Sequence, residues 1–146
     1  MWCRGFPEHP HTGFETITLV EQGVVDHFDS LGNAGRYAAG DVQWLTTGNG
    51  VEHCEMFPLV HEDQANPMEL FQIWFNSSPE QKQPPADYKM LWREQIPHVI
   101  EANTAGQKAD IRVISGEFRR NRMPCLRPPH SWGAPAENKV NAYLIT

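Results

Sequence analysis

The amino-acid sequence predicts an all-β fold, a small barrel or sandwich of short strands. Two observations favour it. The first half of the chain alternates short runs rich in Val, Ile, Thr, Phe and Trp with glycine-containing turns, and helical periodicity is nearly absent there. With 146 residues, 40% of them hydrophobic, the chain is long enough for one domain with a buried core.

The apolar runs predict strands over residues 14–21, 24–29, 42–46, 51–56, 68–75, 88–94, 110–115 and 140–145. Turns are expected at 30–33, 39–41 and 48–50, because the glycines and asparagines there tolerate positive φ. Beyond Gly116, four prolines leave little room for strand pairing and predict an irregular C-terminal arm.

Charge argues against a nucleic-acid partner. The formal net charge is -6, and acidic residues dominate the first 60 positions. The one basic cluster lies near the C-terminus, at Arg119, Arg120, Arg122 and Arg127, and it is typical of a solvated loop. Direct nucleic-acid binding is therefore not expected.

The sequence also argues against a membrane-spanning protein and against a disulfide-stabilised one. The chain has no apolar run of membrane-spanning length and no signal-peptide pattern at its start, so we expect a cytoplasmic protein with no membrane partner. Its cysteines, Cys3, Cys54 and Cys125, are odd in number and widely spaced, which predicts reduced thiols.

Two pairs of polar residues with a spacing of two carry the candidate chemistry. They are His9 with His11, and His53 with Glu55. Residues i and i+2 of a strand point to the same face, so each pair can line one wall of a barrel. Two such walls facing each other would make a site of three imidazoles and one carboxylate, whereas Cys54 would point away from it.

The chemistry of these ligands indicates a transition metal. Imidazole and carboxylate together suit one divalent Fe, Mn, Ni, Co, Cu or Zn ion, while Ca and Mg prefer oxygen ligands. Four protein ligands leave octahedral positions open for water, dioxygen or a chelating substrate. The remaining histidines, His27, His61, His98 and His130, lack a partner at i+2 and are interpreted as ordinary surface or hydrogen-bonded residues.

The surrounding segments resemble the metal-binding half of pirins, a family of the cupin superfamily. The resemblance is carried by HPHTGFET at 9–16, DSLGN at 29–33, GDVQW at 40–44 and GVEHCEM at 50–56, and more loosely by 70–74 and 111–116. It implies a jelly-roll-like cupin β-barrel that holds iron, Fe(II) being the expected state, through His9, His11, His53 and Glu55.

The resemblance also implies alternatives for function. Pirins resemble quercetin-cleaving cupin dioxygenases, so one hypothesis is an oxygenase of the quercetin 2,3-dioxygenase type that acts on dioxygen and a small aromatic, flavonol-like substrate. Its catalytic proton acceptor would be Glu55, or Glu15, which we interpret as a barrel-lining residue and a substitute ligand. The other is an iron-dependent, redox-sensing regulator with a protein partner, as the animal pirin is regarded to be.

The chain is shorter than the family pattern, since pirins normally contain two barrels. We expect a single, partly truncated cupin barrel over residues 1–116, and a C-terminal arm or the start of a truncated second cupin over 117–146. Strands missing from a barrel leave open edges, and homodimerisation or strand exchange would close them.

Overall fold

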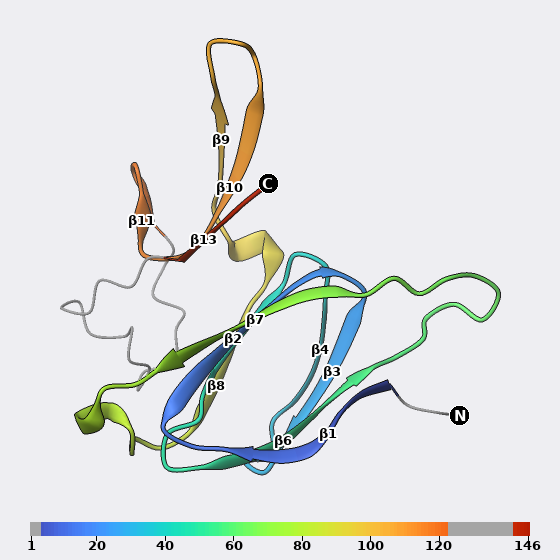
Figure 1. Cartoon of the computed structure of the whole chain (residues 1–146), viewed down its shortest axis with the longest axis vertical. Coiled ribbons are helices and arrows are strands. Elements are labelled where there is room, and N and C mark those ends of the chain that lie inside the picture. The colour runs from blue at the N-terminus through green and yellow to red at the C-terminus, as the bar shows by residue number, and fades with distance from the viewer. Residues whose placement is uncertain (1–3, 123–141) are drawn as a thin grey trace.

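The structure is a computed structural model that describes residues 4–122 and 142–146, and this part of the chain is built from antiparallel strands (Figure 1). The strands are β1 Arg4–His11, β2 Phe14–Gln22, β3 Val24–Asp29, β4 Ala34–Ala38, β5 Val42–Thr46, β6 Val51–Phe57, β7 Glu69–Asn76, β8 Asp87–Leu91, β9 His98–Ala102, β10 Lys108–Ser115, β11 Glu117–Phe118, β12 Asn121–Arg122 and β13 Ala142–Ile145. Two 3-10 helices join them, η1 Pro79–Gln81 and η2 Arg93–Gln95.

Two four-stranded sheets form the body of the molecule. Sheet A has the order β1-β6-β3-β4 and sheet B the order β7-β2-β5-β8. A three-stranded sheet C, β13-β10-β9, rises from the body as the long hairpin of Figure 1, and β11 pairs with β12. In the described residues the hydrogen-bonded ladders form these separate sheets rather than one continuous ring.

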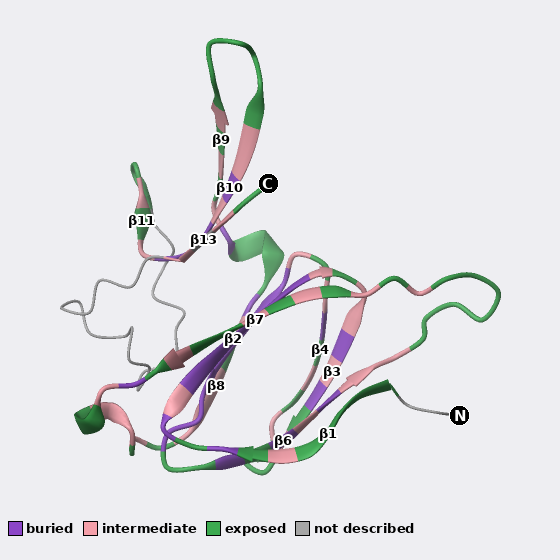
Figure 2. Cartoon of the chain, viewed as in Figure 1, coloured by how far each residue is buried: buried purple, intermediate pink, exposed green. Residues whose placement is uncertain are grey.

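Both faces of sheet B are covered, so the sheet borders two interiors. Side chains alternate along β2 and point into one interior and the other in turn. Thr16, Thr18 and Val20 point toward sheet A, whereas Glu15 and Ile17 point to the opposite side. Figure 2 shows β2 as one of the most continuously buried strands of the molecule, as a strand covered on both faces must be. We call the space between sheets A and B the inner space, and the space on the other side of sheet B the outer core.

The outer core is apolar and is covered by the C-terminal elements. Its buried members are Ile17, Leu19, Val42, Trp44, Leu91, Ile96, Val113 and Ile114. Partly buried Phe75, Val99, Phe118, Ala142 and Leu144 pack against them. Arg112 of β10 donates a hydrogen bond to Glu21 of β2 at 2.6 Å, which adds a charged link between sheets C and B.

The inner space is apolar at one end only. There Val20, Val25 and Tyr37 are buried against Phe57, Met68, Leu70 and Met90. The rest of the inner space is lined by polar side chains, among them Thr16, Thr18, Gln43, His27, His53 and Glu55, each at most 2% exposed. Buried polar groups are costly unless they are paired or bind a ligand, so this space is the candidate site.

The sequence-based prediction of an all-β fold is confirmed, and most of its strands are present to within two residues. One element was wrong: the strand expected over 88–94 ends at Leu91, and η2 follows it. Strands β4, β9, β11 and β12 were not expected, and of β1 only the stretch from His9 to His11 was treated as a strand. The turn prediction holds at Gly32, Gly40 and Gly50, all with positive φ. Most of the predicted C-terminal arm, residues 123–141, lies outside the described residues, although β13 pairs with β10 as a terminal strand.

No helix in the described part of the chain is long and apolar enough to span a membrane.

Candidate metal centre

The candidate site lies on the inner face of sheet A, where β1 and β6 are paired. His9 of β1 lies directly opposite His53 of β6, with the register interrupted by a bulge between Phe6 and His9. The expectation of two facing walls is therefore wrong: the two motifs are on neighbouring strands of one sheet. Cross-strand partners on one face are about 5 Å apart at Cβ, so pairing alone brings the imidazoles together.

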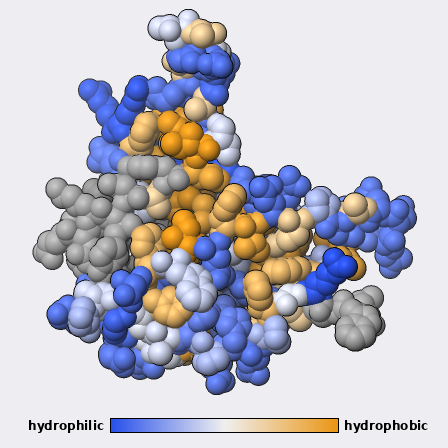
Figure 3. Space-filling model, viewed as in Figure 1, coloured by the Kyte–Doolittle hydropathy of each residue, from blue (hydrophilic) through white to orange (hydrophobic). Residues whose placement is uncertain are grey.

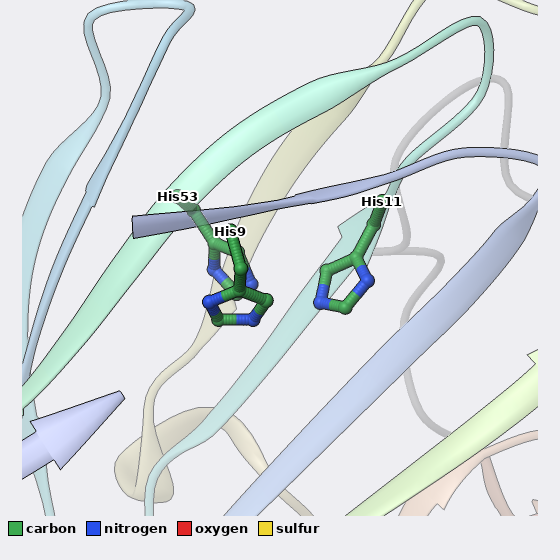
Figure 4. A group of neighbouring side chains, drawn as sticks. All are labelled: His9, His11 and His53. Carbon is green, nitrogen blue, oxygen red and sulfur yellow. The ribbon is translucent and has the colours of Figure 1, made fainter. Parts of the chain in front are cut away.

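Three of the predicted ligands form a tight cluster. One possible donor atom from each of His9, His11 and His53 lies within 4.8 Å of the other two. Their ring centroids are separated by 4.5 Å for His9 and His53, 4.7 Å for His9 and His11, and 4.9 Å for His11 and His53. Figure 4 shows the rings gathered on the same side of the two strands. This is a spacing that a single ion can bridge.

Two of the imidazoles, those of His53 and His11, are kept in the neutral form that binds metal. Burial, followed by the nearby rings of His27, His9 and His11, lowers the pKa of His53 to about 3. Burial and the adjacent His9 also lower the pKa of His11. A neutral imidazole has a free lone pair, so no proton has to be displaced at neutral pH before a metal can bind.

One buried atom identifies where a ligand fits. Nε2 of His53 is buried and has no hydrogen-bond partner in the described part of the chain. An unpaired buried polar atom costs about 1–3 kcal/mol. A metal ion at this nitrogen, beside the rings of His9 and His11, would remove that cost, so the residues present fit a divalent transition metal.

The fourth predicted ligand, Glu55, belongs to a second cluster in this structure. Donor atoms of His27, His53 and Glu55 lie within 4.8 Å of one another. Tyr37 Oη donates to Glu55 Oε1 at 3.3 Å, and Gln72 Nε2 lies 3.3 Å from Oε2. Burial raises the pKa of Glu55, with these hydrogen bonds acting in the opposite direction. His53 is thus shared between two groups of donors on one sheet face.

His27 is the site residue that sequence reasoning missed. It lies on β3, opposite Glu55 of β6, and is fully buried. It contacts His53, with 3.4 Å between the two Nδ1 atoms, and Asp29, with 3.2 Å between Nε2 and Oδ2. The spacing of two between His27 and Asp29, like that of the two motifs, was the signal that could have revealed it.

An aromatic rim borders the cluster of histidines. Trp74 of β7 is 61% exposed, and its ring lies 4.9 Å from Phe14 and 5.5 Å from His11 between centroids. Its Nε1 donates to Gln72 Oε1 at 2.8 Å, and this fixes the Gln72 amide with its NH2 group toward Glu55. The rim thus presents an exposed aromatic surface beside the three histidines.

The structure places the other predicted residues away from this cluster. Glu15 points into the outer core, where its Oε2 accepts from Trp44 Nε1 at 2.7 Å, and it is in neither group of donors. Cys54 points to the opposite side of β6 from His53, as expected, and is half-buried. His61 and His98 are exposed, and His130 lies outside the described residues.

Fold and site together define a cupin-type protein with a histidine-rich candidate metal centre. Comparison with known proteins makes this specific: residues 2–75 match the family model described as Pirin. The chain therefore belongs to the pirin family.

Relatives from distant organisms support this assignment. A Pseudomonas aeruginosa protein described as a putative quercetin 2,3-dioxygenase is 40% identical over 84% of this chain and 42% of its own length. Human pirin is 39% identical over 77% of this chain and 36% of its own. The chain thus spans less than half the length of these curated relatives.

Solved structures agree on the fold. Quercetin 2,3-dioxygenase from Acinetobacter baumannii superposes with a TM-score of 0.73 and 36% identity, over 83% of this chain and 41% of that one. The bacterial pirin YhhW from Escherichia coli, solved in complex with nickel(II), gives a TM-score of 0.55 and 25% identity, over 78% and 51% of the two chains.

Proposed function

We propose that the chain holds one divalent transition metal through His9, His11, His53 and Glu55, with Fe(II) as the native ion. The unpaired, buried Nε2 of His53 in a cluster with the imidazoles of His9 and His11 is the observation that carries this proposal. Glu55 lies on the same face two residues along β6, and a rotation of its side chain would be needed to bring the carboxylate to an ion held by the three histidines. The nickel complex of YhhW supports a divalent ion in this family.

We further propose oxygenase chemistry of the quercetin 2,3-dioxygenase type on a flavonol-like substrate. When bound, the metal would supply a Lewis acid with open coordination positions. The rim formed by Trp74 and Phe14 would stack the aromatic ring of the substrate. Glu55 would accept the hydroxyl proton of the substrate, because a carboxylate beside the metal would lie within reach of an oxygen bound there.

Two measurements test this proposal in sequence. The first is elemental analysis of protein purified without chelator, for the natural chain and for His11→Ala and Glu55→Ala. We expect about one transition metal per chain, reduced in both variants. His61→Ala, which alters an exposed histidine, is the matched control and should retain the metal.

The second measurement is dioxygen consumption with quercetin by the iron-loaded protein. The expected result is quercetin-dependent uptake that falls in Trp74→Ala with metal content unchanged, since Trp74 would hold substrate and not metal. A natural chain that takes up no iron, or that takes it up without consuming dioxygen in the presence of quercetin, would rule out the oxygenase function.

A redox-linked regulator is the second candidate, because sheet B carries an exposed apolar strip suited to a protein partner. On β7, Phe71 is 49% and Ile73 39% exposed, on the face opposite Gln72 and Trp74. Figure 3 shows apolar surface gathered where the C-terminal hairpin meets the body of the molecule. The same strip could instead be buried in a homodimer. Sedimentation of the natural chain beside Phe71→Ser distinguishes the two: a dimer that this substitution dissociates indicates a homodimer contact, and a monomeric natural chain leaves the strip for another protein partner.

A further inference from the structure

We infer that His27 and Asp29 position His53, acting as a hydrogen-bonded relay that leaves Nε2 of His53 free for the metal. The inference deepens the metal site proposed above and depends on it. All members of the relay are buried: His27 is fully buried, His53 is 2% exposed and the Asp29 side chain is fully buried. Two of these residues are absent from the predicted ligand set.

The direction of each hydrogen bond follows from Asp29. Its carboxylate accepts from the backbone N–H groups of Leu31 and Asn33, each at 3.0 Å, and from Nδ2 of Asn33 at 2.9 Å. A carboxylate surrounded by donors is an acceptor only, so the Nε2 atom of His27, 3.2 Å from Oδ2, must carry a proton.

The tautomer of His53 then follows from that of His27. A neutral imidazole protonated at Nε2 has a lone pair at Nδ1, and this atom of His27 lies 3.4 Å from Nδ1 of His53. His53 must donate across this contact and carries its proton at Nδ1. Its Nε2 is left with a lone pair, and this is the buried atom without a partner.

His27 is itself held in place from the opposite sheet. The ring of Tyr88, on β8 of sheet B, stacks on it with 5.1 Å between centroids and 26° between planes. Gly35 lies opposite His27 on β4, and a Cβ atom there would overlap the Tyr88 hydroxyl. The absence of a side chain at Gly35 therefore lets Tyr88 cover His27 and restrict its rotation.

A relay of this kind raises metal affinity by fixing ligand orientation. Ligand imidazoles usually donate their second N–H to a carboxylate or another acceptor, and loss of that acceptor typically costs 10–100-fold in metal affinity. Here the acceptor is an imidazole, which is in turn oriented by a buried carboxylate. His27 is thus a positioning residue, with no contact to the metal.

The test uses Zn(II) as the probe, with affinities measured by chelator competition on the full chain. We expect His27→Leu to weaken zinc binding about 10–100-fold. His27→Asn, whose Oδ1 can take the place of Nδ1 as acceptor, should recover most of that loss. The control is Asp110→Asn, since Asp110 pairs with His98 in a similar but exposed contact of 3.0 Å; it should leave zinc affinity unchanged.

The tautomer of His53 in the natural chain provides a readout independent of activity and of any folding defect in the variants. Imidazole 15N NMR of the metal-free natural chain should show His53 protonated at Nδ1, and His27→Leu should shift it toward the Nε2 form. Protonation at Nε2 in the natural chain would overturn the relay. So would zinc affinity in His27→Leu equal to the natural value, or complete loss of zinc in both His27→Leu and His27→Asn, which would make His27 a ligand. A natural chain that binds no metal would instead defeat the proposed site.

Discussion

The two interiors on either side of sheet B differ in what they bury. The outer core is apolar, and its members come from β2, β5, β8 and the C-terminal elements. The inner space buries histidines, carboxylates and amides, with apolar packing at one end. Alternation along β2 serves both, because Ile17 faces one interior and Thr18 the other. Opposite faces of the same strands thus carry the apolar core that stabilises the fold and the polar side chains of the candidate metal centre.

The largest expected effect lies in the outer core. Trp44→Ala should lower the free energy of unfolding by about 3–5 kcal/mol, because it leaves a large cavity and removes the donor to buried Glu15. Denaturant titration measures the loss. The control is Trp92→Ala, since Trp92 is 40% exposed. A loss below about 1 kcal/mol for Trp44→Ala would mean that the outer core is not the main source of stability.

Gly35→Ala tests the inner space at the point where the two sheets meet. The added methyl overlaps the Tyr88 hydroxyl and should cost about 1–3 kcal/mol, with weaker zinc binding as the Tyr88 ring leaves His27. The double variant Gly35→Ala/Tyr88→Phe, which lacks the overlapping hydroxyl, should regain much of both losses. Additive effects of the two substitutions, measured by denaturation in a double-mutant cycle, would show that this contact is unimportant.

The smallest effect is a change in the pH dependence of stability. The pKa of His53 is about 3 in the folded chain and near 6.5 when unfolded, so the unfolded chain binds the extra proton between these values. Stability of the metal-free protein should therefore fall as pH drops below about 6.5. Glu55, whose pKa burial raises above 4.5, acts in the opposite sense, because its folded form keeps a proton that the unfolded form releases.

The variant His53→Gln isolates the contribution of His53 to this pH dependence. Between pH 6 and 5 its slope of unfolding free energy against pH should be shallower than that of the natural chain by up to about 1.4 kcal/mol per pH unit, the value for one proton. Denaturation in the presence of EDTA measures the two slopes. Equal slopes would mean that His53 is not held neutral by the inner space.

Much of this arrangement could be predicted from local sequence. Strands β2, β3, β5, β6 and β7 and three of the turns follow from apolar alternation and from glycines, which act over a few residues. The spacing of two within each motif placed His9 with His11 and His53 with Glu55 on common faces. The family resemblance pointed to the same four residues.

The pairing of strands that are distant in the sequence could not be predicted from local patterns. That β1 pairs with β6, and β3 with β6 on its other side, depends on pairings between distant strands. These pairings bring His27 beside Glu55. They also place the His9/His11 and His53/Glu55 motifs on neighbouring strands, although the two motifs were expected on facing walls. The face on which Glu15 lies depends in the same way on which side of sheet B the C-terminal elements cover. The predicted boundary at 116, the cytoplasmic location and the identity of the metal stay predictions.

The proposed metal centre is tested most directly by a crystal structure of the iron-loaded chain with anomalous scattering recorded at the iron edge. We expect one peak in the inner space, about 2.0–2.2 Å from a nitrogen of each of His9, His11 and His53 and from a Glu55 oxygen. His27 should contact His53 and not the ion. A peak bound by His27, or no peak between sheets A and B, would overturn the proposed ligand set.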